Sequence, residues 1–164
     1  SSVRDVVLDG YQFLETDQPG KVYKYAETGI DEGCTFKPHK NHHNGLSVDF
    51  IVPGVNETGD SVHLPTNILN QYGYNIEFNN TGNYEGYTID YESLGAHIVA
   101  LHKAANNHKI GIWRVIFAPD LQPYLYKTKY GEYIQKHIQI PKKRSWVRHD
   151  DHYHVDFEVK CRAM

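Results

Sequence analysis

The sequence predicts a single α+β domain that spans residues 1–164. This length fits one domain with a sizeable core. A segment after Asp90 has the apolar spacing of a helix, whereas Leu46–Val52 and His152–Cys161 alternate between apolar and polar residues as strands do. Abundant tyrosine and glycine favour a loop-rich chain in which amphipathic rings cover part of the surface. We therefore expect a small sheet and a few helices joined by loops.

The first half of the chain is expected to be mostly extended. Residues 1–30 contain short alternating stretches on either side of residues 17–20 (Asp-Gln-Pro-Gly), a sequence typical of a turn between two extended segments. Residues 46–52 predict a strand that stops at Pro53-Gly54. Residues 54–88 are rich in Asn, Gly, Tyr and Thr, which predicts mostly loop with short extended pieces.

The second half begins with the predicted helix. Asp90 can cap it, and the polar run 106–108 ends it. Residues 111–118 predict a largely buried strand, and four-residue spacing of Tyr and Ile within 120–139 predicts a short helix. A basic segment then leads to a final strand, 152–161, that alternates strictly. The apolar stripe of the main helix consists of Tyr91, Leu94, Ile98, Leu101 and Ala105.

Charge and hydropathy argue against two classes of partner. The net charge of −3 gives no electrostatic footprint for nucleic acid, and no stretch has the apolar length that spans a bilayer.

The start at Ser1-Ser2 is consistent with a processed or trimmed chain that has lost an export signal. Cys34 and Cys161 can form a disulfide only in an oxidising compartment, and the alternative is two unrelated buried thiols.

Two histidine-rich segments, far apart in the sequence, carry the candidate chemistry. Imidazole nitrogens and carboxylate oxygens are ligands of Zn²⁺ in hydrolytic sites, which use three protein ligands and leave a fourth position for water. The two segments supply both ligand types. Their candidate residues are His39, His42 and Asp49 in the first segment, and His149, Asp151, His152 and His154 in the second.

Strand alternation explains how these side chains can meet. Successive side chains of a strand point to opposite faces, so His152 and His154 share one face, with backbone positions about 6–7 Å apart. Asp49 projects from the polar face of its strand, and His42 comes from the preceding loop. If the two strands are neighbours, His42, Asp49 and His154 occupy three corners of a tetrahedron, and water takes the fourth.

Each of these residues also has a structural interpretation. A single exposed histidine or strand-face carboxylate is usually solvated surface, and Asp150 and Asp151 are most simply a turn. The crowding of five histidines and a carboxylate into two short segments favours a metal site. Asp151 lies three residues before His154, where a carboxylate could reach the reacting water. The other histidines do not fit the ligand spacing and are expected to be structural: His43, His63, His97, His102, His108 and His137.

The two segments resemble zinc metallopeptidases. The pattern His42-x6-Asp49 followed by His152-x-His154 resembles the group that contains lysostaphin, the D-Ala-D-Ala peptidases and the hedgehog signalling domain. The longer segments, which begin at His39 and at His149, are similar to the penicillin-insensitive murein endopeptidases. The resemblance is confined to these segments, and residues 54–88 do not share it.

The resemblance implies a fold and a set of roles. The fold is a small central antiparallel sheet flanked by helices, which carries one catalytic Zn²⁺. The zinc ligands would be His42, Asp49 and His154. His152 would act as general base or stabilise the oxyanion, with Asp151 as the alternative base. His149 and the auxiliary His39 would line the site, and a second metal there is left open.

The resemblance also implies a peptidoglycan peptide as substrate, and therefore a periplasmic or secreted protein. The favoured bond joins D-alanine to diaminopimelate in a murein cross-link. The alternatives are a D-Ala-D-Ala carboxypeptidase, an L-to-D stem endopeptidase, the same chemistry in a secreted lytic effector, or a catalytically silent zinc-stabilised binding module. Arg144, Trp146 and Arg148 would flank the cleft or form solvated surface. An inhibitor or immunity protein and the oligomeric state are left open.

Overall fold

The protein combines helices with antiparallel strands, which confirms the predicted α+β class. The structure is a computed structural model, and it describes residues 2–28, 46–67, 73, 75–145 and 147–159. The elements in chain order are α1 (Val3–Asp17), β1 (Lys24–Thr28), β2 (Ser47–Ile51), β3 (Gly54–Val55), β4 (Ser61–Val62), β5 (Asn83–Tyr84), β6 (Tyr87–Ile89), α2 (Tyr91–Asn107), β7 (Gly111–Ile116), α3 (Gln122–Tyr126), α4 (Gly131–His137) and β8 (His152–Glu158).

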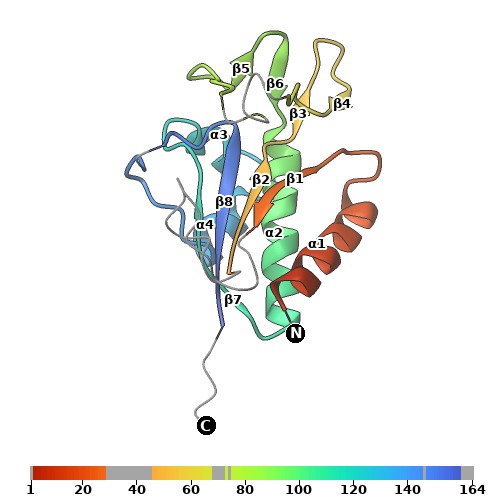
Figure 1. Ribbon diagram of the computed structural model, residues 1–164, viewed down its shortest axis with the longest axis vertical. Helices are drawn as coiled ribbons and strands as arrows, with labels where there is room; N and C mark the ends of the chain where they lie inside the picture. Colours follow the sequence, from red (N-terminus) through yellow and green to blue (C-terminus); the bar gives the residue numbers. More distant parts are fainter. Residues whose placement is uncertain (1, 29–45, 68–72, 74, 146, 160–164) are drawn as a thin grey trace.

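The larger of the two sheets positions the candidate site. Its strand order is β1-β2-β8-β7, and every neighbouring pair is antiparallel. Strands β2 and β8, which are far apart in the sequence, therefore lie side by side at its centre (Figure 1). The smaller sheet, β4-β3-β6-β5, lies at the N-terminal end of α2 (Figure 1).

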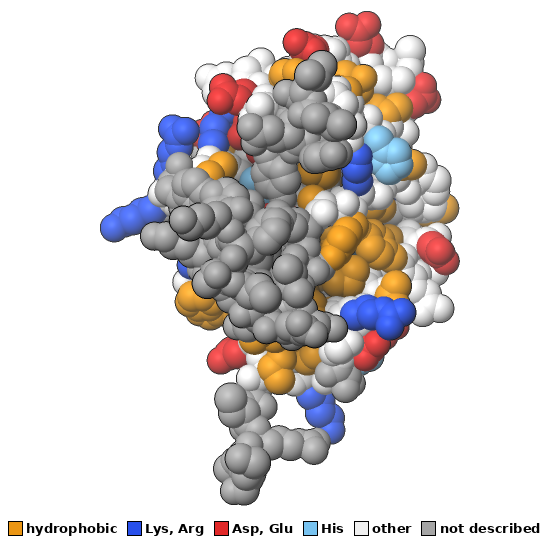
Figure 2. Space-filling model, viewed as in Figure 1, with side chains coloured by type: hydrophobic (Ala, Val, Ile, Leu, Met, Phe, Trp, Pro, Cys, Tyr) orange, Lys and Arg blue, Asp and Glu red, His pale blue; other side chains and the backbone are white. Residues whose placement is uncertain are grey.

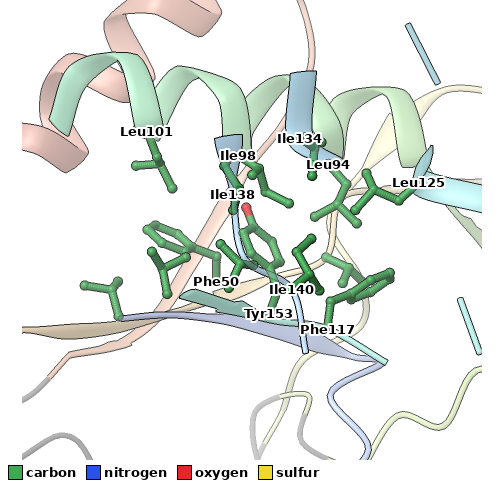
Figure 3. Close-up of a cluster of buried hydrophobic side chains, with 14 of the residues drawn as sticks. Phe50, Leu94, Ile98, Leu101, Phe117, Leu125, Ile134, Ile138, Ile140 and Tyr153 are labelled. Atoms are coloured by element: carbon green, nitrogen blue, oxygen red, sulfur yellow. The ribbon is translucent and has the colours of Figure 1, made fainter. Parts of the chain in front are cut away.

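The hydrophobic core lies between one face of the larger sheet and α2. Phe50 and Tyr153 project from the sheet toward Leu94, Ile98 and Leu101 of the helix (Figure 3). All five side chains are at most 1% exposed. Burying a side chain of this size is worth about 1.5–3 kcal/mol. Helix α1 packs beside α2 (Figure 1), so the sheet is supported on one face and can present functional groups on the other.

Residues 3–17 form a helix, so the prediction of extended segments over residues 1–30 is wrong there. A capping box starts the helix: the Ser2 hydroxyl accepts a hydrogen bond from the Asp5 amide at 3.3 Å, and the Asp5 carboxylate accepts one from the Ser2 amide at 2.9 Å. Its buried residues follow a helical period. Short apolar pairs in the same segment resemble the alternating apolar and polar residues of a strand. The buried residues are Val6, Val7, Gly10 and Leu14.

The later elements follow the predictions, with two differences. Strands β2 and β8 and helix α2 form where expected, and Asp90 caps α2. Residues 120–139 hold two short helices, α3 and α4. Gly131 allows their close approach, because a Cβ there would collide with the carbonyl of Tyr126. Strand β7 lies at the edge of its sheet and is half-buried, with Trp113 53% exposed.

His97 of α2 is fully buried, in agreement with the prediction that this histidine is structural. Its Nδ1 atom pairs with the hydroxyl of Tyr153, and its Nε2 atom has no hydrogen-bond partner among the described residues. Burial disfavours the charged form of the ring and lowers the pKa of His97 to about 3. The ring is therefore neutral in the folded protein at physiological pH.

We expect His97 to make stability depend on pH. Its pKa is about 3 in the folded protein and about 6.5 in an unfolded chain, so the unfolded state binds one more proton between these values. The contribution of His97 to the free energy of unfolding should therefore fall by about 1.4 kcal/mol for each pH unit below about 6.5. Urea denaturation of the wild type and His97→Gln between about pH 7 and pH 5 tests this. Equal pH slopes in the two proteins would contradict it.

One face of the molecule is mixed in charge (Figure 2). On the face shown in Figure 2, positively and negatively charged side chains are interspersed, without a concentrated basic patch among the coloured residues. Within the same described part of the chain, no helix has the length and apolar character needed to cross a membrane.

Candidate metal centre

Strands β2 and β8 bring Asp49 and His154 together. Their register places the two Cα atoms directly opposite each other, so both side chains lie on the same face of the sheet. The Nδ1 atom of His154 lies 2.7 Å from Oδ1 of Asp49. The two residues are 4% and 1% exposed, respectively. Members of both histidine-rich segments therefore meet on the face opposite α2.

A second carboxylate holds the other side of the His154 ring. The Nε2 atom of His154 lies 2.8 Å from Oδ1 of Asp156. Asp156 also accepts hydrogen bonds from the Ser47 hydroxyl and from Nε of Arg114, each at 2.6 Å. Because both ring nitrogens of His154 have a partner, the orientation of the ring on the sheet is fixed.

His149 and His152 extend the cluster beside His154. The ring centroids of His149 and His152 are 4.7 Å apart, and those of His149 and His154 are 6.4 Å apart. The Nδ1 atom of His152 lies 3.0 Å from Oδ2 of Asp151. All four residues are buried. The second segment thus forms a compact group of three imidazoles with a supporting carboxylate.

His149 has an unusual backbone. Its φ of 57° lies in the left-handed region, which residues other than glycine seldom adopt. Its carbonyl accepts a hydrogen bond from the Ala118 amide at 2.9 Å, and its Nδ1 atom donates to the Val147 carbonyl at 2.9 Å. These contacts hold a conformation of the kind that clusters at functional sites. With Nδ1–H engaged, the neutral ring carries its lone pair on Nε2.

Arg148 anchors the turn that carries the histidines. Its guanidinium donates to Asp150 at 2.9 Å, to Asp120 at 2.6 Å and to the Phe78 carbonyl. Asp150 also accepts a hydrogen bond from the Phe78 amide at 2.7 Å. Arg148 is therefore a half-buried cation engaged by two carboxylates, a structural role that was not among the sequence expectations for it. Asp150 belongs to the same anchor.

The three imidazoles have different proton affinities. Burial, reinforced by repulsion from His152, lowers the pKa of His149 to about 4. Burial also disfavours a charged His152, but the hydrogen bond and charge of Asp151 outweigh it and raise its pKa. For His154, the hydrogen bonds to Asp156 and Asp49 overcome burial and raise the pKa to about 9. Divergent pKa values among adjacent groups are typical of functional sites.

Asp49 and His154 fit two of the three proposed zinc ligands. Two ligand atoms about 2.0–2.1 Å from zinc at a tetrahedral angle lie about 3.3 Å apart. Nδ1 of His154 and Oδ1 of Asp49 lie 2.7 Å apart. To bind one zinc ion, these two atoms would have to move apart by only about 0.6 Å. Within the described residues, no group of three or more His, Cys, Asp or Glu side chains is arranged to hold a metal ion. A zinc site of this kind therefore needs a further ligand.

The proposed third ligand, His42, lies outside the described residues. The auxiliary His39 lies outside them as well, as do both cysteines of the possible disulfide. The structure therefore places Asp49, Asp151 and the three histidines of the second segment. The residues with a predicted role that lie outside the described ranges are His39, His42, His43, Cys34, Cys161 and Trp146.

The sequence interpretation missed the network around Asp156. Asp156 follows His154 by two positions, and Ser47 precedes Asp49 by two, so strand alternation alone places each pair on one face. That signal could have identified both residues. Arg114 was not identifiable in this way, because its approach depends on the pairing of β7 with β8.

Comparison of the sequence with protein families and with curated proteins finds no match to either.

Proposed function

We propose that the protein is a zinc-dependent peptidoglycan hydrolase that cleaves an amide bond in murein peptide cross-links. The observation that carries the proposal is the buried 2.7 Å contact between His154 and Asp49, formed by two segments that are distant in sequence. An imidazole and a carboxylate on one sheet face, beside two further histidines, have the ligand chemistry of a hydrolytic zinc site. The same residues carry the resemblance to lysostaphin-type and penicillin-insensitive murein peptidases.

In this proposal His42, Asp49 and His154 hold the zinc ion. The ion would supply a Lewis acid there, which would make the attacking water easier to deprotonate near neutral pH. His152 takes the proton from the attacking water and returns it to the leaving amine. Asp151, which accepts a hydrogen bond from Nδ1 of His152 at 3.0 Å, keeps the lone pair of that ring on Nε2.

His149 has a different role in the proposed site. Burial and the proximity of His152 lower its pKa to about 4, so its ring is neutral near pH 7. Its Nδ1–H is engaged by the Val147 carbonyl. The remaining nitrogen, Nε2, can accept a hydrogen bond but cannot donate one in this tautomer. This property suits a group that orients the attacking water or a substrate N–H.

The proposed substrate follows from the resemblance. We favour the bond between D-alanine and diaminopimelate, in a periplasmic or secreted protein. A D-Ala-D-Ala carboxypeptidase, an L-to-D stem endopeptidase and a secreted lytic effector use the same chemistry on related peptides. The products distinguish these activities, because each cut leaves a different peptide.

The purified chain loaded with Zn²⁺ is expected to cleave intact murein. A strong chelator should stop cleavage, and added Zn²⁺ should restore it, because the Lewis acid and the activated water are lost together. Mass analysis of the products identifies the bond. Monomers released from cross-linked dimers indicate the D-alanyl to diaminopimelate cut, whereas loss of terminal D-alanine indicates a carboxypeptidase.

Two outcomes would contradict the proposal. Stoichiometric zinc binding without cleavage of any muropeptide would favour a zinc-stabilised binding module. Cleavage that persists at full rate after complete removal of zinc would exclude the metal centre as the source of activity.

A further inference from the structure

We propose that Asp156, held in place by Arg114 and Ser47, is a positioning residue that presents Nδ1 of His154 to the metal. This inference rests on the proposed function, because it assigns a role toward the same zinc ion. It adds residues that lie outside the proposed ligand and acid–base set. The juxtaposition that supports it is a chain of buried contacts across three neighbouring strands.

The register of the sheet builds this chain of contacts. Asp156 on β8 lies opposite Ser47 on β2 and opposite Arg114 on β7. Ser47 and Arg114 each donate to Asp156 at 2.6 Å, and Asp156 lies 2.8 Å from Nε2 of His154. The Arg114 guanidinium also lies 4.2 Å from the centroid of the Trp113 ring, which restricts its plane. Asp156 is therefore held from both neighbouring strands.

Asp156 supports the form of the ring that could bind a metal. Both ring nitrogens of His154 face a carboxylate, so without a bound metal both can donate a hydrogen bond. A histidine that binds a metal through Nδ1 carries its one proton on Nε2, where the Asp156 carboxylate lies 2.8 Å away and can accept it. Carboxylates that accept from the outer nitrogen of a metal-binding histidine commonly fix its tautomer and orientation in this way.

The charges around the ring indicate which side faces the metal. Asp49 lies opposite His154, and His152 and Asp49 lie on the same face of the sheet, so Asp49 faces the histidine cluster. Asp156, in contrast, has one oxygen on the guanidinium of Arg114. A cation bound by Asp156 would be repelled by that guanidinium in a buried environment. We therefore place the metal on the Nδ1 side of the His154 ring. On the Nε2 side, Asp156 holds the ring in position.

The test compares zinc affinity in matched variants of the full chain. Asp156→Asn keeps the shape of the side chain and removes its charge, so zinc should bind about 10–100-fold more weakly. Arg114→Gln should weaken zinc binding in the same direction, because it releases Asp156. Competition with a chromophoric chelator gives the dissociation constants. The visible absorption spectrum of the Co²⁺-loaded protein should also change in Asp156→Asn, since it reports the ligand geometry.

Asp90→Asn is the matched control. The Asp90 side chain is 9% exposed and pairs with Lys21 at 2.7 Å, whereas the Asp156 side chain is 7% exposed and pairs with Arg114 at 2.6 Å. The control removes a comparable carboxylate charge at the N-cap of α2, outside the proposed ligand and acid–base set, and it should leave zinc affinity and the Co²⁺ spectrum unchanged.

Each contrary result has a distinct meaning. If Asp156→Asn and Arg114→Gln bind zinc as tightly as the wild type, the positioning role is wrong, while zinc binding and murein cleavage by the wild type still support the proposed function. If Asp156→Asn loses zinc as completely as His154→Ala, Asp156 is itself a ligand and the positioning role is again wrong. A wild-type chain that binds no zinc would overturn the proposed function together with this inference.

Discussion

Replacing His154 with alanine is expected to abolish tight zinc binding and to slow murein hydrolysis by at least about a thousandfold. The Nδ1 atom of His154 is one of the two proposed ligand atoms that the structure describes, and it lies 2.7 Å from the other, on Asp49. A bound metal contributes several kcal/mol to transition-state stabilisation, and each 1.36 kcal/mol corresponds to about tenfold in rate. Equilibrium dialysis gives the zinc content, and product release from murein gives the rate.

Folding must be controlled in this experiment. Loss of His154 leaves Asp49 and Asp156 buried without the imidazole between them, which can destabilise the fold. Asp49→Asn, which keeps the shape of its side chain, should also lose zinc and activity. His108→Ala is a matched control, because His108 forms a 2.7 Å pair with Asp9 away from the site. Full zinc content in a folded His154→Ala protein would show that the ligand assignment is wrong.

Much of the site geometry was predictable because strand alternation is a strong local rule. The sequence places Asp49 on the polar face of one strand and His152 and His154 on the polar face of another. The structure has both faces as predicted and pairs the strands in the register that joins Asp49 to His154. Tyr153, between the two histidines on the opposite face of the strand, is fully buried and points toward α2 (Figure 3). Here local periodicity and tertiary burial favour the same arrangement.

Helix α1 and the contacts of Arg148 and Arg114 were not predicted, for different physical reasons. Helix α1 was missed because its apolar pairs resemble short strands, and its capping box at Ser2 and Asp5 was overlooked. The engagement of Arg148 by two carboxylates requires the loop at Phe78 to reach the turn before β8. Likewise, Arg114 reaches Asp156 only because β7 pairs with β8. These are long-range contacts that one sequence does not specify.

Replacing His152 with alanine is expected to leave zinc bound while kcat falls by about 10²–10⁴-fold. The ring lies beside His149, with centroids 4.7 Å apart, and its Nδ1 atom is held by Asp151 at 3.0 Å. It is therefore fixed as a proton acceptor without being one of the proposed zinc ligands. Added imidazole should partly restore turnover, because a small base can occupy the space that the side chain leaves. Loss of zinc from this variant would make His152 a ligand instead.

The choice between His152 and Asp151 as the base follows from combining their substitutions. If Asp151 acts only by holding His152, Asp151→Asn should slow the wild type but cause almost no further loss in the His152→Ala protein, since the group it positions is gone. If Asp151 is itself the base, the double variant should lose several further orders of magnitude. Single substitutions cannot separate these cases, because an asparagine at 151 can donate to Nδ1 and force the ring into the wrong tautomer. The 3.0 Å contact between the two side chains predicts the non-additive result.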